Sequence, residues 1–393
     1  GAYTGNLFKN RTTGAFVDGV PQFRSTTIPE FSGNKILQFK GFRNPVSAEG
    51  DLLLWIGTTD EVGGPATSKG AIWKADDNTV LINPINGSVE LVPMDMNESR
   101  MGCGYILHPF VNAYDQDRKR AEPVLFTPSG TVSIIQPSRI SEYGYEAQRD
   151  GSGSWVQPTM DNEFKAVAIN NQGAVLCTGK GVFKVEGRDR YYTENWSFVS
   201  RNSSIVIENL PPGGSDINDH GEIVGYNNNG TWIYLPSGKY GLPPGVSYID
   251  TVRYTDGYDD NYRFLDIQPL INNQGDVTWL GTYFSAVGAP TYPTRLWKNG
   301  STYNLTDLFE TEEAFNIRSV TEMNEKGDLL LLTTYTFEYE GQTYNAFANR
   351  ILSTRPFQTE LVVNVTDDLP DADPNDKVID VDLDKAGLQV SLR

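Results

Sequence analysis

The chain has few histidines and cysteines, no long apolar run and a deficit of positive charge. It contains 2 His and 2 Cys, and 32 Lys and Arg against 50 Asp and Glu give a formal net charge of −18 over 393 residues. Phosphate binding needs a clustered basic face, so this charge argues against nucleic acid and against an anionic membrane surface as partners. The chain also lacks a run of about eighteen apolar residues, so we expect no direct insertion into a membrane.

The scarcity of histidine restricts the catalytic chemistry. A Ser-His-Asp triad would need His108 or His220, and the sequence contains no Gly-x-Ser-x-Gly motif. His220 occupies a turn position that related segments fill with Gln or Lys, and His108 precedes a proline at the end of an expected strand. Zinc sites with two histidines and glycine-rich phosphate loops are equally unsupported. We therefore expect a protein that is not an enzyme and has no cofactor, with calcium as the one inorganic ligand to consider.

The two cysteines, Cys103 and Cys177, follow comparable turns and so occupy comparable strands of successive repeats. Neighbouring strands can bring such residues together, but so few cysteines do not indicate a disulfide scaffold. We expect two free, buried thiols.

A short motif recurs along the chain: Asn, two variable residues, Gly and then a short apolar run. Copies lie at residues 169–176, 217–225, 271–277 and 323–330, with a copy at 46–53 that lacks the Asn and one at 96–100 that has Arg100 in place of Gly. The turn positions are 50, 100, 173, 221, 275 and 327, so one repeat takes about 50 residues apart from one longer interval. A period of this length indicates a propeller or an array.

Each copy predicts a turn that leads into a strand buried on both faces, because Asn bonds to nearby backbone and Gly accepts a positive φ. Between the copies lies an aromatic strand that runs into a second turn, at residues 15–19, 71–76, 125–130, 182–187, 232–238, 296–300 and 346–350. Two strand pairs make one blade. These seven copies predict an all-β fold, a β-propeller of seven four-stranded blades with little helix, and an irregular β-sandwich is the alternative.

We expect the propeller to span residues 1–355 and a linker with a different pattern to occupy residues 356–393. Residues 1–6 resemble the tail of a repeat strand, so the turn strand before them has to come from elsewhere. Residues 385–390 offer a degenerate copy, although the Asp-rich segment before them has no counterpart ahead of the six earlier turns. The sequence shows neither an initiator Met nor a signal peptide, which suggests that it is not a primary translation product.

Two loops are candidate binding sites. The longest repeat carries an insertion near residues 140–164 that includes Trp155, and binding residues are often carried on such loops. The second loop mixes aromatic rings that can stack on a sugar with carboxylates that can bind Ca²⁺: Tyr254, Asp256, Tyr258, Asp259, Asp260 and Tyr262. The simpler interpretation is a solvated acidic loop whose tyrosines pack on a blade edge. The same carboxylates are the candidates for a glycosidase or polysaccharide lyase.

The linker offers a second calcium candidate, in five aspartates within ten residues: Asp367, Asp368, Asp371, Asp373 and Asp376. They supply enough oxygens for the six to eight ligands that Ca²⁺ takes. Their spacing does not match an EF-hand loop, so this prediction rests on composition alone.

The two recurring elements together resemble the HAF repeats of bacterial extracellular proteins, in which an Ile-Asn-x-x-Gly-x-Ile-Val-Gly strand alternates with an Ala-Phe-Leu-Trp-x-x-Gly strand. The match covers about residues 1–355, is best at 217–225 and 296–300, and departs at Arg100 and at the long second repeat. The resemblance implies a β-propeller and an extracellular location, without implying an activity.

The tail resembles the opening of the CSLREA domain, which introduces right-handed parallel β-helices in secreted bacterial surface proteins. The resemblance lies in residues 362–373 and 387–393, and the usual Cys positions are Ile379 and Val390, so the family's disulfide is absent. It implies a short segment like the start of a β-helix, in a fragment of a longer surface protein that continues beyond Arg393.

These patterns predict a non-enzymatic extracellular or cell-surface module that acts in adhesion, in binding a glycan or protein partner, or in assembly. The C-terminal segment is a candidate for self-association, because exposed strand edges can pair between chains. Two alternatives stay open: a carbohydrate-active enzyme, glycosidase or lyase, on the same scaffold, and a structural subunit of an extracellular filament. An acidic and aromatic cluster at one mouth of the ring favours sugar binding, and an apolar outer patch favours assembly.

Overall fold

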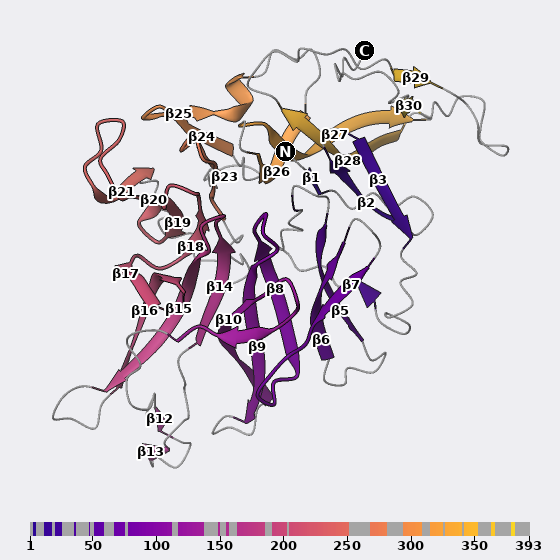
Figure 1. Cartoon of the computed structure of the whole chain (residues 1–393). Helices are drawn as coiled ribbons and strands as arrows, with labels where there is room; N and C mark the ends of the chain where they lie inside the picture. Colours follow the sequence, from indigo (N-terminus) through magenta and orange to yellow (C-terminus); the bar gives the residue numbers. More distant parts are fainter. Residues whose placement is uncertain are drawn as a thin grey trace.

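A computed structural model of the chain describes residues 3–4, 12–17, 20–25, 35–36, 47, 51–58, 67–74, 78–111, 117–136, 148–149, 155–156, 163–184, 191–202, 204–250, 268–280, 294–308, 315–324, 327–339, 342–352, 363–365 and 379–381. Apart from the short 3₁₀ helix η2 (Leu305–Leu308), every described element is a β-strand (Figure 1). The prediction of an all-β fold with little helix is confirmed for these residues.

The strands form antiparallel meanders, which we number as units 1 to 7 in chain order. Unit 1 consists of β1 (Tyr3–Thr4), β2 (Thr12–Val17) and β3 (Val20–Ser25). Unit 2 consists of β4 (Lys35–Ile36), β5 (Leu52–Thr58), β6 (Thr67–Trp73) and β7 (Thr79–Ile82). Unit 3 consists of β8 (Glu90–Met96), β9 (Gly102–Val111), β10 (Asp117–Phe126) and β11 (Val132–Ile134). One parallel pair, Ser68 with Glu90, joins units 2 and 3 into an eight-stranded sheet.

The remaining units follow the same plan. Unit 4 consists of β14 (Glu163–Ile169), β15 (Ala174–Lys184), β16 (Tyr191–Arg201) and β17 (Ser204–Leu210). Unit 5 consists of β18 (Gly214–Ile217), β19 (Ile223–Asn227), β20 (Gly230–Leu235) and β21 (Gly245–Asp250). Unit 6 consists of β22 (Leu270–Ile271), β23 (Val277–Leu280), β24 (Thr294–Lys298) and β25 (Ser301–Asn304). Unit 7 consists of β26 (Phe315–Met323), β27 (Leu329–Tyr339) and β28 (Gln342–Leu352).

Two small hairpins lie outside the units. Strands β12 (Gln148–Arg149) and β13 (Trp155–Val156) pair within the connection from unit 3 to unit 4. Strands β29 (Val363–Val365) and β30 (Ile379–Val381) pair in the C-terminal segment. In the part of the chain that is described, the antiparallel four-stranded sheets are as predicted, with units 1 and 7 showing three strands each.

One predicted strand was placed wrongly. Residues 182–187 were expected to start the aromatic third strand of unit 4, but Val182 and Phe183 lie in the second strand, β15. The third strand is β16, which contributes Trp196 and Phe198 to the core. The hairpin of β15 and β16 is longer than its counterpart in unit 5. The end of β15 therefore carries an apolar and aromatic pattern that resembles the start of a separate strand.

The apolar core lies between successive units. In β19, Ile223 packs in a cluster with Leu176 and Leu210 of unit 4, whereas Val224 packs with Val277 and other residues of unit 6. Adjacent residues of a strand point to opposite faces, so β19 buries both faces, as the sequence predicts. Equivalent clusters join units 2 and 3, units 3 and 4, and units 6 and 7.

The glycine that closes the best copy of the motif has a packing role. Trp232 is fully buried between units 4 and 5, and its indole N–H donates to the carbonyl of Pro212 at 3.1 Å. Its ring lies over Gly225 on the neighbouring strand, where a Cβ atom would come within 2.3 Å of Cζ2. Any larger residue at position 225 would therefore displace the indole ring.

Candidate functional site: the first turns and the opposite end of the units

The turn between the first and second strands of a unit, which we call its first turn, is held by one repeated set of hydrogen bonds. In unit 4, Asn170 Oδ1 accepts from the backbone N–H groups of Gln172 at 3.1 Å and Ala174 at 2.9 Å. The backbone N–H of Asn170 donates to the Ala174 carbonyl, and that of Gly173 donates to the Asn170 carbonyl. Gly173 has φ +74°, a conformation that costs glycine little. The Asn-x-x-Gly motif thus closes a turn within itself.

The two irregular copies of the motif occupy the same turn. Ser47 replaces Asn in unit 2, and its Oγ accepts the Asp51 N–H at 3.1 Å while its own N–H donates to the Asp51 carbonyl. Arg100 replaces Gly in unit 3 and adopts φ +63°. A left-handed conformation costs a non-glycine residue about 1–2 kcal/mol, so another interaction has to hold Arg100 there. Its Nε donates to the carboxylate of Asp51, whose side chain is fully buried.

Asparagine side chains connect the first turns of successive units. Each amide Nδ2 donates to the backbone carbonyl of the Asn in the next turn: Asn97 to Asn170 at 3.0 Å, Asn170 to Asn218 at 2.9 Å, Asn218 to Asn272 at 2.9 Å and Asn272 to Asn324 at 3.5 Å. We call this series the asparagine ladder. Each side chain accepts inside its own turn and donates to the next, so one residue type fixes both the turn and its neighbour.

A second series runs beside the ladder, one residue further along each turn. The backbone N–H of Glu98 donates to Asn171 Oδ1, that of Asn171 to Asp219 Oδ1, and that of Asp219 to Asn273 Oδ1, at 3.0, 2.7 and 2.7 Å. Asp219 Oδ2 also accepts from the amides of Asn171 and Asn273. These bonds are more exposed than those of the ladder, and the three backbone N–H groups donate in the ladder's direction, whereas the Asn273 amide donates back to Asp219.

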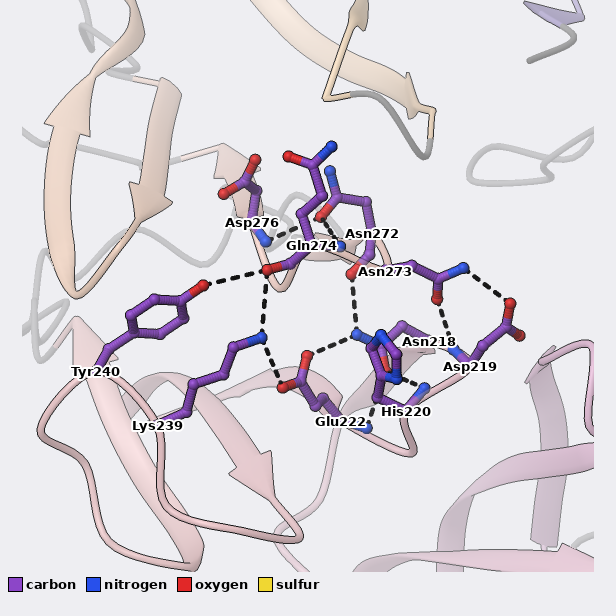
Figure 2. A network of polar contacts seen from close by, with 10 residues as sticks. All are labelled: Asn218, Asp219, His220, Glu222, Lys239, Tyr240, Asn272, Asn273, Gln274 and Asp276. Carbon is purple, nitrogen blue, oxygen red and sulfur yellow. Dashed lines mark hydrogen bonds and ion pairs between the residues drawn. The ribbon is translucent and has the colours of Figure 1, made fainter.

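Buried acids sit directly after the turn glycines, and each has a cationic partner. Glu222 Oε1 lies 3.0 Å from Lys239 Nζ, and Asp276 Oδ2 lies 2.5 Å from Lys298 Nζ. Figure 2 shows how Lys239 spans two units, because its Nζ also donates to the Gln274 carbonyl at 3.2 Å, beside the Tyr240 hydroxyl. Asp51 and Arg100 form a third pair of this kind. In all three pairs the acid follows a first turn, so the ion pairs help to hold the turns.

The ladder defines two ends of the units. In an antiparallel meander, the first turn and the turn between strands three and four lie at one end, and the other connections lie at the opposite end. Since the first turns contact one another in series, they share one end of the assembly, which we call the turn end. The connections between units start and finish at the opposite end, the loop end. Both candidate binding loops therefore begin at the loop end, after β11 and after β21.

The structure describes few of the predicted site residues. Trp155 lies in β13, where it pairs with Arg149 in a hairpin on the long connection from unit 3 to unit 4. The other candidate ligand and calcium residues lie outside the described residues: Tyr254, Asp256, Tyr258, Asp259, Asp260, Tyr262, Asp367, Asp368, Asp371, Asp373 and Asp376. Within the described ranges, no group of three or more His, Cys, Asp or Glu is arranged to hold a metal ion.

The cysteines are free and buried, as predicted, and His108 lies within β9, not at the end of a strand. His220 is an exposed turn residue whose N–H donates to Asn218 Oδ1, and His108 Nε2 lies 2.9 Å from Glu122 Oε2. Cys103 and Cys177 are free, buried and packed in one cluster. Burial raises the pKa of the Cys177 thiol far above its usual range, so it stays protonated and unreactive.

One tyrosine also has a shifted pKa. Burial, together with the charge of Glu90, raises the pKa of Tyr105 to about 12. Tyr105 packs with Trp55, Val92 and Ala121 in a core cluster, so the shift reflects packing and does not mark a catalytic group.

A cavity of about 10 Å³ lies between units 3 and 4, with Ser133, Ile135, Val175 and Ser200 among its lining residues. This volume has room for about one water molecule and is too small for a sugar. No helix in the described ranges has the length and apolar character needed to cross a membrane.

Comparisons with known proteins add little. No family model matches the chain, and no curated protein matches it. Two solved structures of a PL25 ulvan lyase, a polysaccharide lyase, align with 88% of this chain and 82% of theirs at 10% identity, with TM-scores of 0.27 and 0.25. The second holds a bound glucuronic acid and sulfated rhamnose unit. TM-scores this low carry no argument about fold or activity.

Proposed function

We propose that the chain is a seven-bladed β-propeller that acts as a non-enzymatic extracellular binding module, with a glycan or protein ligand held at the loop end. The succession of seven strand units, of which units 2 to 7 pack against one another in series, supports the propeller. The HAF-like pattern of the sequence supports an extracellular location.

The observation that carries the proposal is the difference between the two ends. At the turn end, side chains form the asparagine ladder between successive units and the ion pairs beside it. At the loop end, the connections from unit 3 to unit 4 and from unit 5 to unit 6 are long and carry the aromatic and acidic residues. A rigid scaffold that presents variable loops is the usual architecture of a binding site.

The aromatic residues fit a glycan ligand best. Trp155, Tyr254, Tyr258 and Tyr262 all belong to loop-end connections. Aromatic faces stack on the apolar faces of sugar rings, and neighbouring carboxylates accept hydrogen bonds from sugar hydroxyls. Asp256, Asp259 and Asp260 are the carboxylates for that role, with or without Ca²⁺.

A glycan array on the intact chain, with and without Ca²⁺, tests the proposal. We expect binding to one glycan class, weakened at least about tenfold in Trp155→Ala or Tyr258→Ala. The matched control is Tyr303→Ala, because Tyr303 is an exposed aromatic residue of β25 that lies outside both long connections. Tyr303→Ala should bind like the wild type.

The remaining outcomes separate the alternatives. Cleavage of a bound polysaccharide, abolished in Asp259→Asn or Asp260→Asn, would replace the proposal with a carbohydrate-active enzyme. Binding that is equal in all the aromatic variants would place the ligand away from the loop end. An array without binding, together with concentration-dependent polymers, would favour the filament subunit.

A further inference from the structure

Open strand edges and exposed apolar side chains coincide on the fourth strands of the units. Strands β17, β21 and β25 each end the strand order of their sheet, so one edge of each carries backbone N–H and C=O groups that no described strand pairs (Figure 1). The exposed large apolar side chains of the described residues all lie on these three strands: Val206 on β17, Val246 and Tyr248 on β21, and Tyr303 on β25. The fourth strands are therefore the surface to examine for a partner.

The fourth strands differ in how their open edges are protected. Proteins limit pairing at such edges with very short strands, with bulges or with charged residues. Strands β7, β11 and β25 have only four, three and four residues. Strand β17 has seven, but register shifts interrupt its pairing with β16, and it carries the charge of Glu208. Strand β21 has six residues, pairs with β20 without a shift from Gly245 to Tyr248, and carries no charge over that stretch. It is the least protected of the described fourth strands.

Two apolar side chains of β21 stand together on one face of the sheet. Val246 lies opposite Tyr234 of β20 and is 39% exposed, and Tyr248 lies opposite Trp232 and is 38% exposed. They are two positions apart, so they point to the same side of the strand. The Tyr248 hydroxyl accepts from Asn227 Nδ2 at 3.2 Å, which holds the ring in place. The edge of β21 thus presents an ordered apolar pair beside its open backbone groups.

We infer that β21 pairs antiparallel with β21 of a second copy of this chain, around a two-fold axis at Ser247. In this register each Val246 lies opposite the Tyr248 of the other copy, and the two Ser247 residues lie opposite each other. An aromatic residue opposite a β-branched residue is a favourable cross-strand pair, and so are two hydroxyl residues. A two-fold contact uses the same patch on both copies, so the strand is complementary to itself. The two four-stranded sheets of unit 5 then continue into each other.

The charges along β21 fit a second copy better than a strand of opposite charge. Residues 245–249 are uncharged, and in the same register Asp250 lies opposite Pro244 of the other copy. The two Asp250 carboxylates are then about 20 Å apart along the strands, which is more than the Debye length of about 8 Å at physiological ionic strength. An edge that binds a basic strand needs acids within the paired stretch, and residues 245–249 have none.

The contact is small, so the dimer should be weak. Five residues of each copy pair, whereas a standard interface uses about 20–30 residues of each partner. We expect a dissociation constant of about 100 µM at physiological salt. Each copy carries a net charge of −18, and this repulsion opposes association. Salt screens the repulsion, so the dissociation constant should fall as the salt concentration rises.

Sedimentation velocity of the full-length chain, from about 1 to 500 µM, measures this equilibrium. Val246→Lys and Tyr248→Lys should each raise the dissociation constant at least about tenfold, because lysine blocks pairing at an open edge. The matched control is Val206→Lys, since Val206 is a 54% exposed valine of another fourth strand, and it should dimerise like the wild type. Equal melting temperatures at low concentration show that the lysine variants are folded.

Cysteine cross-linking tests the register. Ser247→Cys should form a disulfide-linked dimer in oxidised glutathione, because position 247 lies opposite itself. Val246→Cys should cross-link at least about fivefold less, because its neighbour across the axis is Tyr248. Cys103 and Cys177 are buried, so they do not compete for the reaction.

Three outcomes would overturn the inference. The first is a monomer at every concentration and salt. The second is a dimer that both lysine variants leave intact, which would place the contact elsewhere. The third is a monomer that binds a peptide of alternating Lys and Val less tightly as salt rises, which would make β21 a site for a basic strand. The inference goes beyond the proposed function, since a dimer that binds no glycan would contradict only the ligand and a monomer that binds glycan only the dimer.

Discussion

The turn end and the loop end of the units are made of the same strands but use polar residues differently. At the turn end, Asn218 is 4% exposed and its side chain makes hydrogen bonds within its turn and to the next unit. At the loop end, Asn228 and Asn229 of the turn between β19 and β20 are exposed, and the Asn229 N–H donates to Asn227 Oδ1 within the same turn. Polar residues therefore carry stability at the turn end, whereas Asn228 and Asn229 at the loop end are open to solvent.

The largest expected effect is that of Asn218→Ala. The substitution removes the acceptor of the His220 and Glu222 N–H groups and one of two donors to the Asn272 carbonyl, which keeps the Gly275 N–H. We expect a loss of about 3 kcal/mol in the free energy of unfolding, measured by urea denaturation. Asn228→Ala, at the loop end of the same unit, should change it by less than about 0.5 kcal/mol. Equal losses at both positions would end the distinction between the two ends.

The second effect concerns the ion pair of Glu222 and Lys239 in unit 5, whose lysine also donates to the Gln274 carbonyl of unit 6. Lys239→Met leaves the Glu222 carboxylate, 7% exposed, without its cation. Because the Lys239 side chain is itself 31% exposed, solvent screens part of the cost, and we expect a loss of about 1–2 kcal/mol. Adding Glu222→Gln should recover part of this loss, since a neutral amide needs no counter-charge. No recovery in the double variant would mean that Lys239 acts through packing alone.

The smallest effect is expected for Arg100→Gly, because two contributions oppose each other. Glycine relieves the strain of φ +63°, but the substitution removes the pairing with the buried Asp51. We expect a net loss of about 1 kcal/mol. In an Asp51→Asn background the same substitution should become neutral or stabilising. Thermal unfolding of the four proteins in this double-mutant cycle measures the coupling.

The local part of this fold could be read from the sequence, and the long-range part could not. Asn170 and Gly173 predict their turn because both act on backbone within four residues. The bond from Asn170 to the carbonyl of Asn218 depends on the placement of strands 48 residues apart, which no local pattern encodes. The prediction of the third strand in unit 4 was wrong for a local reason. Val182 and Phe183 at the end of β15 have the apolar pattern expected of a new strand.

The same distinction between local pattern and long-range contact applies to the candidate site. Loop-end residues such as Trp155 and Tyr258 were selected by composition, and the structure describes only the backbone of Trp155 among the predicted site residues. The acids at Asp51, Glu222 and Asp276 were missed, although an acidic residue directly after the turn position recurs in the sequence. Their cations lie 17 to 49 residues away, so only the folded chain reveals the pairing.

The ladder also sets how freely the chain can change in length. Asn97 and Asn170 are separated by 73 residues and Asn170 and Asn218 by 48, yet the two bonds measure 3.0 and 2.9 Å. Insertions at the loop end therefore do not change how the first turns of neighbouring units align. Such a scaffold tolerates the acquisition, loss or exchange of whole surface segments, both in natural diversification and in an engineered display framework.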